Sequence, residues 1–191
     1  MSWTTDPQHT SFEFAVRHMV ISTVKGRFGE FTIEADIDES DLTRSTGKAV
    51  VKTGSVDTRE PQRDTHLKSA DFFDAEKYPE MSYVITKVEG ADGEYELTGD
   101  LTIKDVTRPV TLKGEITGHV ADPWGNTRLG LSVTGKLNRK DFGLTWNVLT
   151  EAGGLLVGDE VKIAIDAEFV KAQVAEAETE VDDKVTAGVA G

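Results

Sequence analysis

Apolar and polar residues alternate one by one along most of this chain. Such a period of two is typical of β-strands that bury one face and leave the other in water. The pattern is clearest from Tyr95 to Lys104, where Leu97, Leu101 and Ile103 fall on one face and charged or hydroxyl side chains on the other. The alternation therefore predicts an all-β fold.

Eight segments carry this pattern or are rich in β-branched residues: Ser11–Arg17, Phe31–Ile37, Lys48–Val56, Met81–Val88, Tyr95–Lys104, Val110–Val120, Leu129–Leu137 and Val161–Phe169. Turn sequences such as Asp92-Gly93 separate several of them, which makes neighbours antiparallel. Strands with one apolar face can bury those faces together by curling the sheet on itself, and closure also removes exposed edges. The sequence predicts an eight-stranded antiparallel β-barrel.

Two connections, Asp57–Pro79 and Asn138–Gly158, are too long to be tight turns, and we expect them to hold short helices or lids. In the first connection Asp64 is a candidate N-cap for a helix of about two turns. A further short helix is expected around His18–Ile21.

Composition sets the domain organisation and excludes several partners. Residues 1–171 form one predicted barrel domain, and residues 172–191 form an acidic tail without aromatic residues, which we expect to be disordered. The 34 Asp and Glu exceed the 21 Lys and Arg, and the net charge of −13 argues against nucleic acid as a partner. No apolar run is long enough for a membrane-spanning helix, so stable membrane insertion is not expected.

Catalytic and metal signatures are weak. The chain has no cysteine, no G-x-S-x-G turn and no metal-ligand spacing among its four histidines, which are His9, His18, His66 and His119. We therefore assign no catalytic residue, no metal site and no cofactor. The sequence pairs Arg63-Asp64 and Arg139/Asp141 are interpreted as local ion pairs that hold the two long connections.

The inward faces decide whether such a barrel is hollow. Three consecutive predicted strands carry Gly99, Gly114, Gly118 and Gly135 on their apolar faces. These glycines are consistent either with barrel corners around a filled core or with room for a ligand. A cavity here would be walled by aliphatic and aromatic side chains, which suits an alkyl or isoprenoid chain. The candidate wall residues are Phe14, Phe31, Ile33, Tyr83, Leu97, Leu101, Leu112, Gly114, Ile116, Gly118, Leu131, Val133 and Ile163.

A series of short motifs occurs in a characteristic order: Trp3, Asp6-Pro7, Val16-Arg17-His18, Val24-Lys25-Gly26-Arg27-Phe28, Arg63-Asp64, His66-Leu67-Lys68-Ser69, Asp71-Phe72-Phe73-Asp74, Tyr78-Pro79, Val106-Thr107-Arg108-Pro109-Val110, Asp141-Phe142-Gly143 and Val157-Gly158-Asp159-Glu160-Val161. On these residues the chain resembles the YceI-like family from about Trp3 to Val170. The resemblance implies a lipocalin-like barrel that binds a polyisoprenoid lipid, such as a long-chain quinone or its precursor, and frequently forms a homodimer.

Many members of that family carry a secretion signal and work in the periplasm. The first residues of this chain show no basic stretch followed by an apolar block. We therefore expect no secretion signal, and a cytoplasmic location.

These observations predict a lipid-binding protein that is not an enzyme and that transports, stores or sequesters a polyisoprenoid. His18 and His66 are candidate contacts for a lipid headgroup, or else make structural hydrogen bonds to the backbone. Two alternatives stay open. The protein could be an enzyme that acts on such a lipid with His18 or His66 as acid or base, or a β scaffold with a filled core that works through protein contacts.

Overall fold

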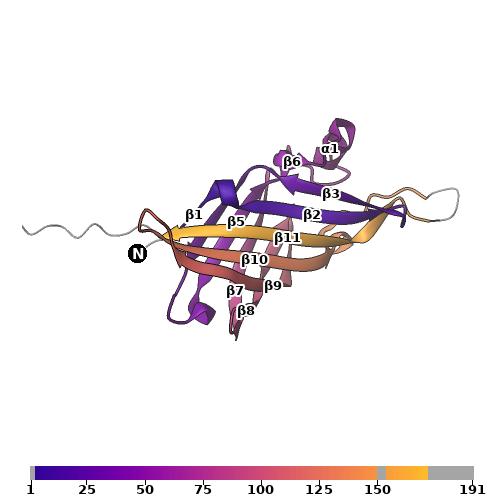
Figure 1. Ribbon diagram of the computed structural model, residues 1–191. Helices are drawn as coiled ribbons and strands as arrows, with labels where there is room; N and C mark the ends of the chain where they lie inside the picture. Colours follow the sequence, from indigo (N-terminus) through magenta and orange to yellow (C-terminus); the bar gives the residue numbers. More distant parts are fainter. Residues whose placement is uncertain (1–2, 150–153, 172–191) are drawn as a thin grey trace, which may run out of the picture.

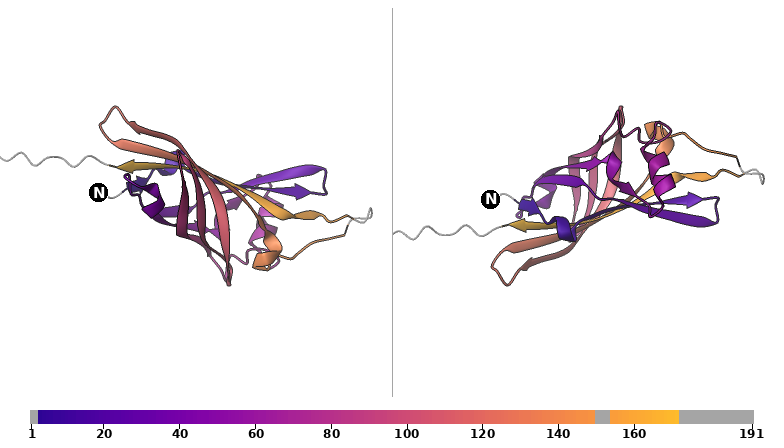
Figure 2. Two further views of the ribbon diagram at one scale, coloured as in Figure 1. Left: turned by 90° about the horizontal axis from the view of Figure 1, so that it is seen from below. Right: turned by 90° about the horizontal axis from the view of Figure 1, so that it is seen from above.

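The computed structural model describes residues 3–149 and 154–171, so the predicted tail at 172–191 lies outside the described residues. The chain forms one eleven-stranded antiparallel sheet that curls into a half-barrel (Figure 1; Figure 2). In chain order its elements are β1 (Trp3–Thr5), η1 (Pro7–His9), β2 (Ser11–His18), β3 (Ser22–Phe28), β4 (Phe31–Asp36), η2 (Leu42–Arg44), β5 (Thr46–Lys52), η3 (Thr53–Ser55), β6 (Val56–Asp57), α1 (Pro61–Lys68), β7 (Glu80–Ala91), β8 (Glu94–Ile103), β9 (Val106–Ala121), β10 (Thr127–Asn138), η4 (Arg139–Phe142) and β11 (Val157–Lys171), where η marks a 3₁₀ helix.

The predicted all-β antiparallel architecture is confirmed, but the predicted number of eight strands is wrong. The eight expected segments are β2, β4, β5, β7, β8, β9, β10 and β11, and the structure adds β1, β3 and β6. β1 and β6 are too short to show a period, and β3 has apolar residues only at Val24 and Phe28. In β3 a side chain at Gly26 would collide with the ring of Phe14, so this strand needs its glycine.

The sheet is also not a closed barrel. Its strand order runs β4-β5-β7-β8-β9-β10-β11-β2-β3-β6, with β1 paired to β11, so the terminal strands β4 and β6 do not pair with each other in the described part of the chain. Side-chain contacts instead join β4 to β1 and β2. Near the chain start, Thr5 Oγ1 donates to the carbonyl of Ile33 at 3.2 Å, and the rings of Phe12 and Phe31 lie 4.7 Å apart.

The two long connections hold short helices, α1 and η4, as expected, but the details of the first differ from the prediction. α1 begins at Pro61, and its N-cap is Glu60, whose carboxylate accepts from the backbone N–H groups of Gln62 and Arg63. Asp64 does not cap the helix because its carboxylate accepts from the backbone and hydroxyl of Thr58 at 2.9 and 2.6 Å. Proline is favoured at the first helical position, where a backbone N–H would have no partner, and this explains why α1 begins before the predicted cap Asp64.

The short helix expected at His18–Ile21 is absent. β2 and β3 pair as far as His18 opposite Ser22, which leaves Met19, Val20 and Ile21 as a tight turn. Met19 has a φ of 50° and Val20 a φ of 66°, so both lie in the left-handed region. No helix in the described part of the chain is long and apolar enough to cross a membrane.

A charged network joins the chain start to the turn between β9 and β10. Arg128 contacts Asp122 at 2.9 Å and Asp6 at 3.2 Å and is also paired with Glu168. Burial works to raise the pKa of Asp122, but hydrogen bonds from Arg128, from the Asn126 side chain and backbone, and from the Trp124 backbone outweigh it and lower the pKa to about 2.

Replacing Asp122 by Asn should lower the melting temperature at pH 7, and the difference from wild type should shrink as the pH falls from about 4 to about 2. The folded-state pKa lies below the ordinary value of 3.8, so the stabilisation is complete above that value and is lost as the pH falls through the folded-state pKa. Thermal unfolding followed by circular dichroism at several pH values measures this effect. The control is Asp166→Asn on the exposed face of β11, and a pH-independent difference for Asp122→Asn would contradict the assignment.

Candidate functional site

An elongated cavity of about 700 Å³ runs along the inner face of the curled sheet. On β11 alone it is lined by every second residue over most of the strand, namely Val157, Val161, Ile163, Ile165, Ala167 and Phe169. At about 3.3 Å per residue these positions span roughly 40 Å, so the cavity follows nearly the whole strand. The interior is therefore not filled by its own side chains.

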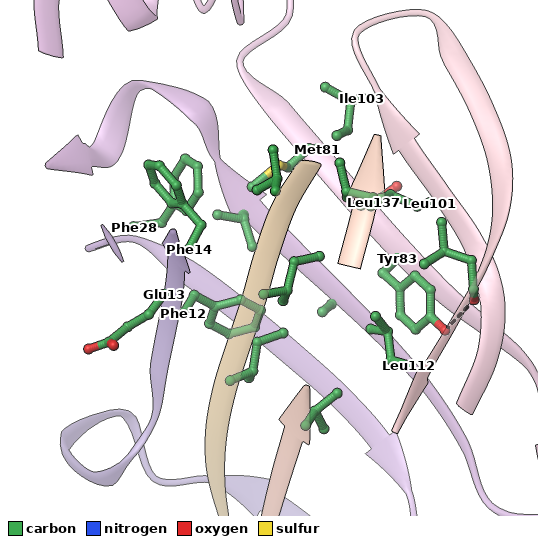
Figure 3. A pocket seen from close by; sticks show the side chains of 18 of the residues that line it. Phe12, Glu13, Phe14, Phe28, Met81, Tyr83, Leu101, Ile103, Leu112 and Leu137 are labelled. Atoms are coloured by element: carbon green, nitrogen blue, oxygen red, sulfur yellow. Dashed lines mark hydrogen bonds between the residues drawn. The ribbon is translucent and has the colours of Figure 1, made fainter. Parts of the chain in front are cut away.

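Most of the predicted wall residues line this cavity: Phe14, Ile33, Tyr83, Leu97, Leu101, Leu112, Ile116, Leu131, Val133 and Ile163. Figure 3 shows Phe12, Phe14 and Phe28 on one side and Tyr83, Leu101 and Leu112 on the other. Phe31 does not line it, because its ring packs on Phe12 and borders a second, smaller pocket. Whether the lining residues bind a lipid stays a prediction.

The predicted glycines do not themselves line the cavity. A side chain at Gly99 would collide with the Tyr83 ring, and one at Gly135 would collide with Leu112. Gly114 lies in contact with leucine side chains, and Gly118 faces open space away from the cavity. At Gly99 and Gly135 the missing side chain makes room for a neighbour's ring or branched chain, and the hollow arises between the walls.

Tyr83 is the polar exception in the middle of the wall. Its hydroxyl lies 2.6 Å from the carbonyl oxygen of Leu97 and 3.0 Å from that of Val110, and it donates to this pair of acceptors. Burial, with a contribution from the charge of Asp100, raises the pKa of Tyr83 to about 12. The hydroxyl is thus neutral and bonded to the backbone, which leaves an apolar ring toward the cavity.

Aromatic rings from the two long connections meet at one end of the cavity. The His66 ring stands edge-on to Trp146 at 4.5 Å and to Phe72 at 5.1 Å, and all three line the cavity. His66 Nε2 lies 2.8 Å from Asp71 Oδ2, which fixes the ring and leaves Nδ1 for another partner. We call this end, where His66 of α1 meets Phe72 and Trp146, the rim.

The second predicted histidine is connected to this end through Val157, which is hydrogen-bonded to Asn147, the neighbour of Trp146. His18 ends β2 opposite Val157 of β11, and both line the cavity together with exposed Arg17 and exposed Gln62 of α1. Because exposed side chains belong to the lining here, the cavity reaches the surface at this end. His18 of β2 and His66 of α1 are far apart in the sequence, and the structure brings both to one cavity.

The expected ion pairs within the two long connections are wrong. The Arg63 guanidinium donates to the Thr58 hydroxyl at 2.7 Å and to the Thr58 carbonyl at 2.9 Å, while Asp64 binds the same threonine. Arg63 and Asp64 are neighbours that both bind one buried residue rather than each other. The sequence shows two adjacent charges, but it does not show the threonine between them.

Arg139 holds the second connection against β11. Its side chain is only 4% exposed and donates to the carbonyls of Leu144, Trp146 and Gly158, with Asp159, not Asp141, as its acidic partner at 3.4 Å. Burial lowers the pKa of Arg139, and Asp159 partly offsets this. One guanidinium with five donors can satisfy several carbonyls that would otherwise be buried without partners.

The wall list from the sequence omits several lining residues. Phe12 and Ile165 share a face with the predicted residues Phe14 and Ile163, and Met81 and Leu137 share a face with other predicted residues of their strands, so the period of two could have identified these four. Phe28 lies on β3, which the period of two did not reveal. Trp146 and Phe72 lie in connections without periodicity, and only their type, large and aromatic, gave any signal.

A cluster outside the cavity brings together side chains of the types that ligate metals. Asp6, His9 and Glu168 have ligand atoms within 4.8 Å of one another. Arg128 already binds both carboxylates, and a hydrogen bond from His9 lowers the pKa of Asp6 while the same contact raises the pKa of His9. The resident guanidinium supplies the positive charge that a cation would bring.

Comparisons with known proteins agree with this architecture. The YceI-like domain family model matches residues 3–169. A UPF0312 protein of Staphylococcus aureus (strain MSSA476) is 34% identical over 169 residues, which cover 88% of this chain and 96% of that protein. The crystal structure of a Campylobacter jejuni YceI protein matches with a TM-score of 0.71 and 31% identity, over 82% of this chain and 90% of that one. A polyisoprenoid binding domain from Saccharophagus degradans shares the fold, with a TM-score of 0.63 at 13% identity, over 88% and 98% of the two chains.

Replacing Arg139 by Met should cost about 3 kcal/mol or more of unfolding free energy, because it leaves buried carbonyls without donors. Urea unfolding measures the loss. The matched control is Lys140→Met, which removes a neighbouring exposed cation that also binds Asp159, at 2.8 Å, and should cost only about 0–1 kcal/mol. Equal losses in the two variants would contradict the role of Arg139.

Proposed function

We propose that the cavity of this chain, which belongs to the YceI-like domain family, holds the apolar tail of a long-chain polyisoprenoid lipid. The observation that carries the proposal is the cavity itself, which is long, mostly apolar and walled largely by strands of one continuous sheet. The Saccharophagus degradans domain of the same fold is named for polyisoprenoid binding, which supports the choice of ligand class.

The chemistry of the wall favours a hydrocarbon chain over a compact polar ligand. Along the strands most of its side chains are Phe, Leu, Ile and Val, and the hydroxyl of Tyr83 is already bonded to the backbone. Burying a methylene contributes about 0.8 kcal/mol, so each five-carbon isoprene unit supplies on the order of 3–4 kcal/mol before the cost of ordering the chain. Several units in a preformed cavity provide affinity without any catalytic group.

The rim at His18 and His66 is where a polar headgroup would lie. Both imidazoles line the cavity, and so does the exposed Arg17, which precedes His18 in β2. An imidazole can donate or accept, so it suits a hydroxyl, a carbonyl or an anionic group at the end of the chain. In this arrangement the tail lies along β11, and the headgroup stays near water.

Binding of this kind serves transport, storage or sequestration, because it shields an apolar tail from water without changing it. The rival hypothesis, an enzyme with His18 or His66 as acid or base, is tested through the same two residues. Turnover of a bound lipid that vanishes when these histidines are replaced would favour the enzyme. A bound lipid that is recovered unchanged favours the carrier.

Replacing Ala49 by Phe should lower binding of the prenyl alcohol solanesol about tenfold or more while leaving the melting temperature nearly unchanged. Ala49 lines the cavity between Ile33 and Tyr83, so the added ring would occupy the space of the lipid tail. Fluorescence titration and native mass spectrometry of co-purified lipid measure the binding. The control is Ala164→Phe on the exposed face of β11. Wild-type protein that neither releases nor binds a prenyl lipid would overturn the proposed function.

Replacing both His18 and His66 by Gln should weaken binding of solanesol about three- to thirtyfold and leave binding of squalene, an isoprenoid hydrocarbon without a headgroup, unchanged. The ratio of the two affinities separates headgroup contacts at the rim from tail contacts along the wall. The expected size follows because each lost hydrogen bond is worth about 1 kcal/mol. Replacing His119, exposed on β9, by Gln is the matched control. An unchanged ratio would remove both histidines from the site.

A further inference from the structure

Large apolar side chains are exposed at the end of the molecule where β2 turns into β3. Val20 is 76% exposed and Ile21 80%, and Met19 is exposed beside them. The second long connection adds exposed Val148, Leu149 and Leu155. We call these six residues the apolar tip.

The two parts of the apolar tip are joined by backbone hydrogen bonds. The N–H of Met19 donates to the carbonyl of Leu156 at 2.9 Å, and the N–H of Leu156 donates to the carbonyl of Val148 at 3.0 Å. Leu149 and Leu155 form an antiparallel bridge beyond them. Figure 1 shows the β2–β3 turn and the second connection at the same end, opposite the β9–β10 turn. The tip is therefore one surface rather than scattered side chains.

The turn does not have the sequence that its backbone favours. Met19 and Val20 both have positive φ, a conformation suited to Gly, Asn or Asp and costly for a β-branched residue. An exposed turn could satisfy this geometry with polar residues at no loss of packing. Strain combined with exposed hydrophobic surface at one turn indicates that the side chains have a function outside the fold.

The tip is continuous with the mouth of the cavity. His18 precedes Met19 and lines the cavity, and Leu156 and Val157, which follow Leu155, line it too. A lipid that leaves the cavity between these residues comes out beside the exposed side chains. The tip thus borders the mouth through which the proposed lipid would enter.

We infer that the apolar tip docks into the surface of a lipid bilayer and places the cavity mouth against the membrane from which the lipid is taken. This inference rests on the proposed function, because a polyisoprenoid is held in bilayers and would otherwise have to cross water. Val20, Ile21 and Leu149 enter the acyl boundary, as apolar side chains of interfacial proteins do.

Charge near the tip fits this occupant. Arg17 and Lys25 are exposed on the two strands that end in the turn, and they would meet lipid phosphates when the tip is buried. The protein as a whole is strongly acidic, with a net charge of −13, and resists closer approach to an anionic surface. Docking is accordingly shallow and reversible, which a carrier requires.

The test variant is Val20→Gly with Ile21→Thr, which relieves the positive φ and removes the two most exposed side chains. Flotation with phosphatidylcholine vesicles measures docking, and transfer of solanesol from those vesicles measures loading. We expect both flotation and solanesol transfer to fall about tenfold or more, because two large aliphatic side chains are no longer transferred from water into the bilayer. The melting temperature should be unchanged or higher because the strained turn is relieved.

The matched control is Val120→Thr with Trp124→Ser, which removes two exposed apolar residues, 59% and 78% exposed, at the opposite end. It should float and load like wild type. Loss of flotation in the control alone, or equal flotation of wild type and the tip variant, would overturn the inference. A change of oligomeric state in the tip variant, seen by light scattering, would assign the tip to a protein interface and also overturn it.

Binding of solanesol delivered from detergent micelles separates this inference from the proposed function. Wild type and tip variant should bind micellar solanesol equally well, because their cavities are the same. Failure of wild type to bind it would reject the lipid ligand itself. Normal micellar binding without vesicle flotation would reject only the docking surface.

Discussion

Burial of one face of a single continuous sheet is the constraint from which the other features of this protein follow. Each long strand places alternate residues inside, and the fifteen residues of β11 carry β10 along one edge and β2 and β1 along the other. Because the sheet curls around its own apolar face, that face needs no second layer of structure. What the curled sheet leaves between its walls is an elongated apolar space rather than a solid core.

The ends of this space are made by the parts of the chain that lack periodicity. Phe72 and Trp146 come from different connections and meet around His66. Arg139 binds the carbonyls of the second connection and so sets where Trp146 lies. The strands therefore form the wall of the cavity, whereas the rim depends on a few polar contacts that hold the connections in place.

The period of two predicted the long strands, and with them most of the wall, because inward and outward positions are fixed once a strand is located. It could not predict β3, where Gly26 replaces an apolar residue so that the Phe14 ring can pack on bare backbone. It also could not predict partners distant in sequence. Arg139 and Asp159 are twenty residues apart, and the threonine that binds both Arg63 and Asp64 has no signature of its own. The histidines of the rim were identified from their place in the chain, in segments expected to cover a barrel end, and the fact that both line one cavity depends on tertiary structure.

The unpaired edges of the sheet determine what sets the diameter of the cavity. In a cylinder closed by hydrogen bonds, the diameter is set by the number of strands and their stagger, and widening it means breaking a ladder. Here β4 and β6 are not hydrogen-bonded to each other, and β4 instead packs through side chains on β1 and β2, among them the rings of Phe31 and Phe12. Small sliding movements of such rings leave every backbone ladder intact. The diameter of the cavity along this side is thus set by the packing of side chains and not by a closed ladder of backbone hydrogen bonds.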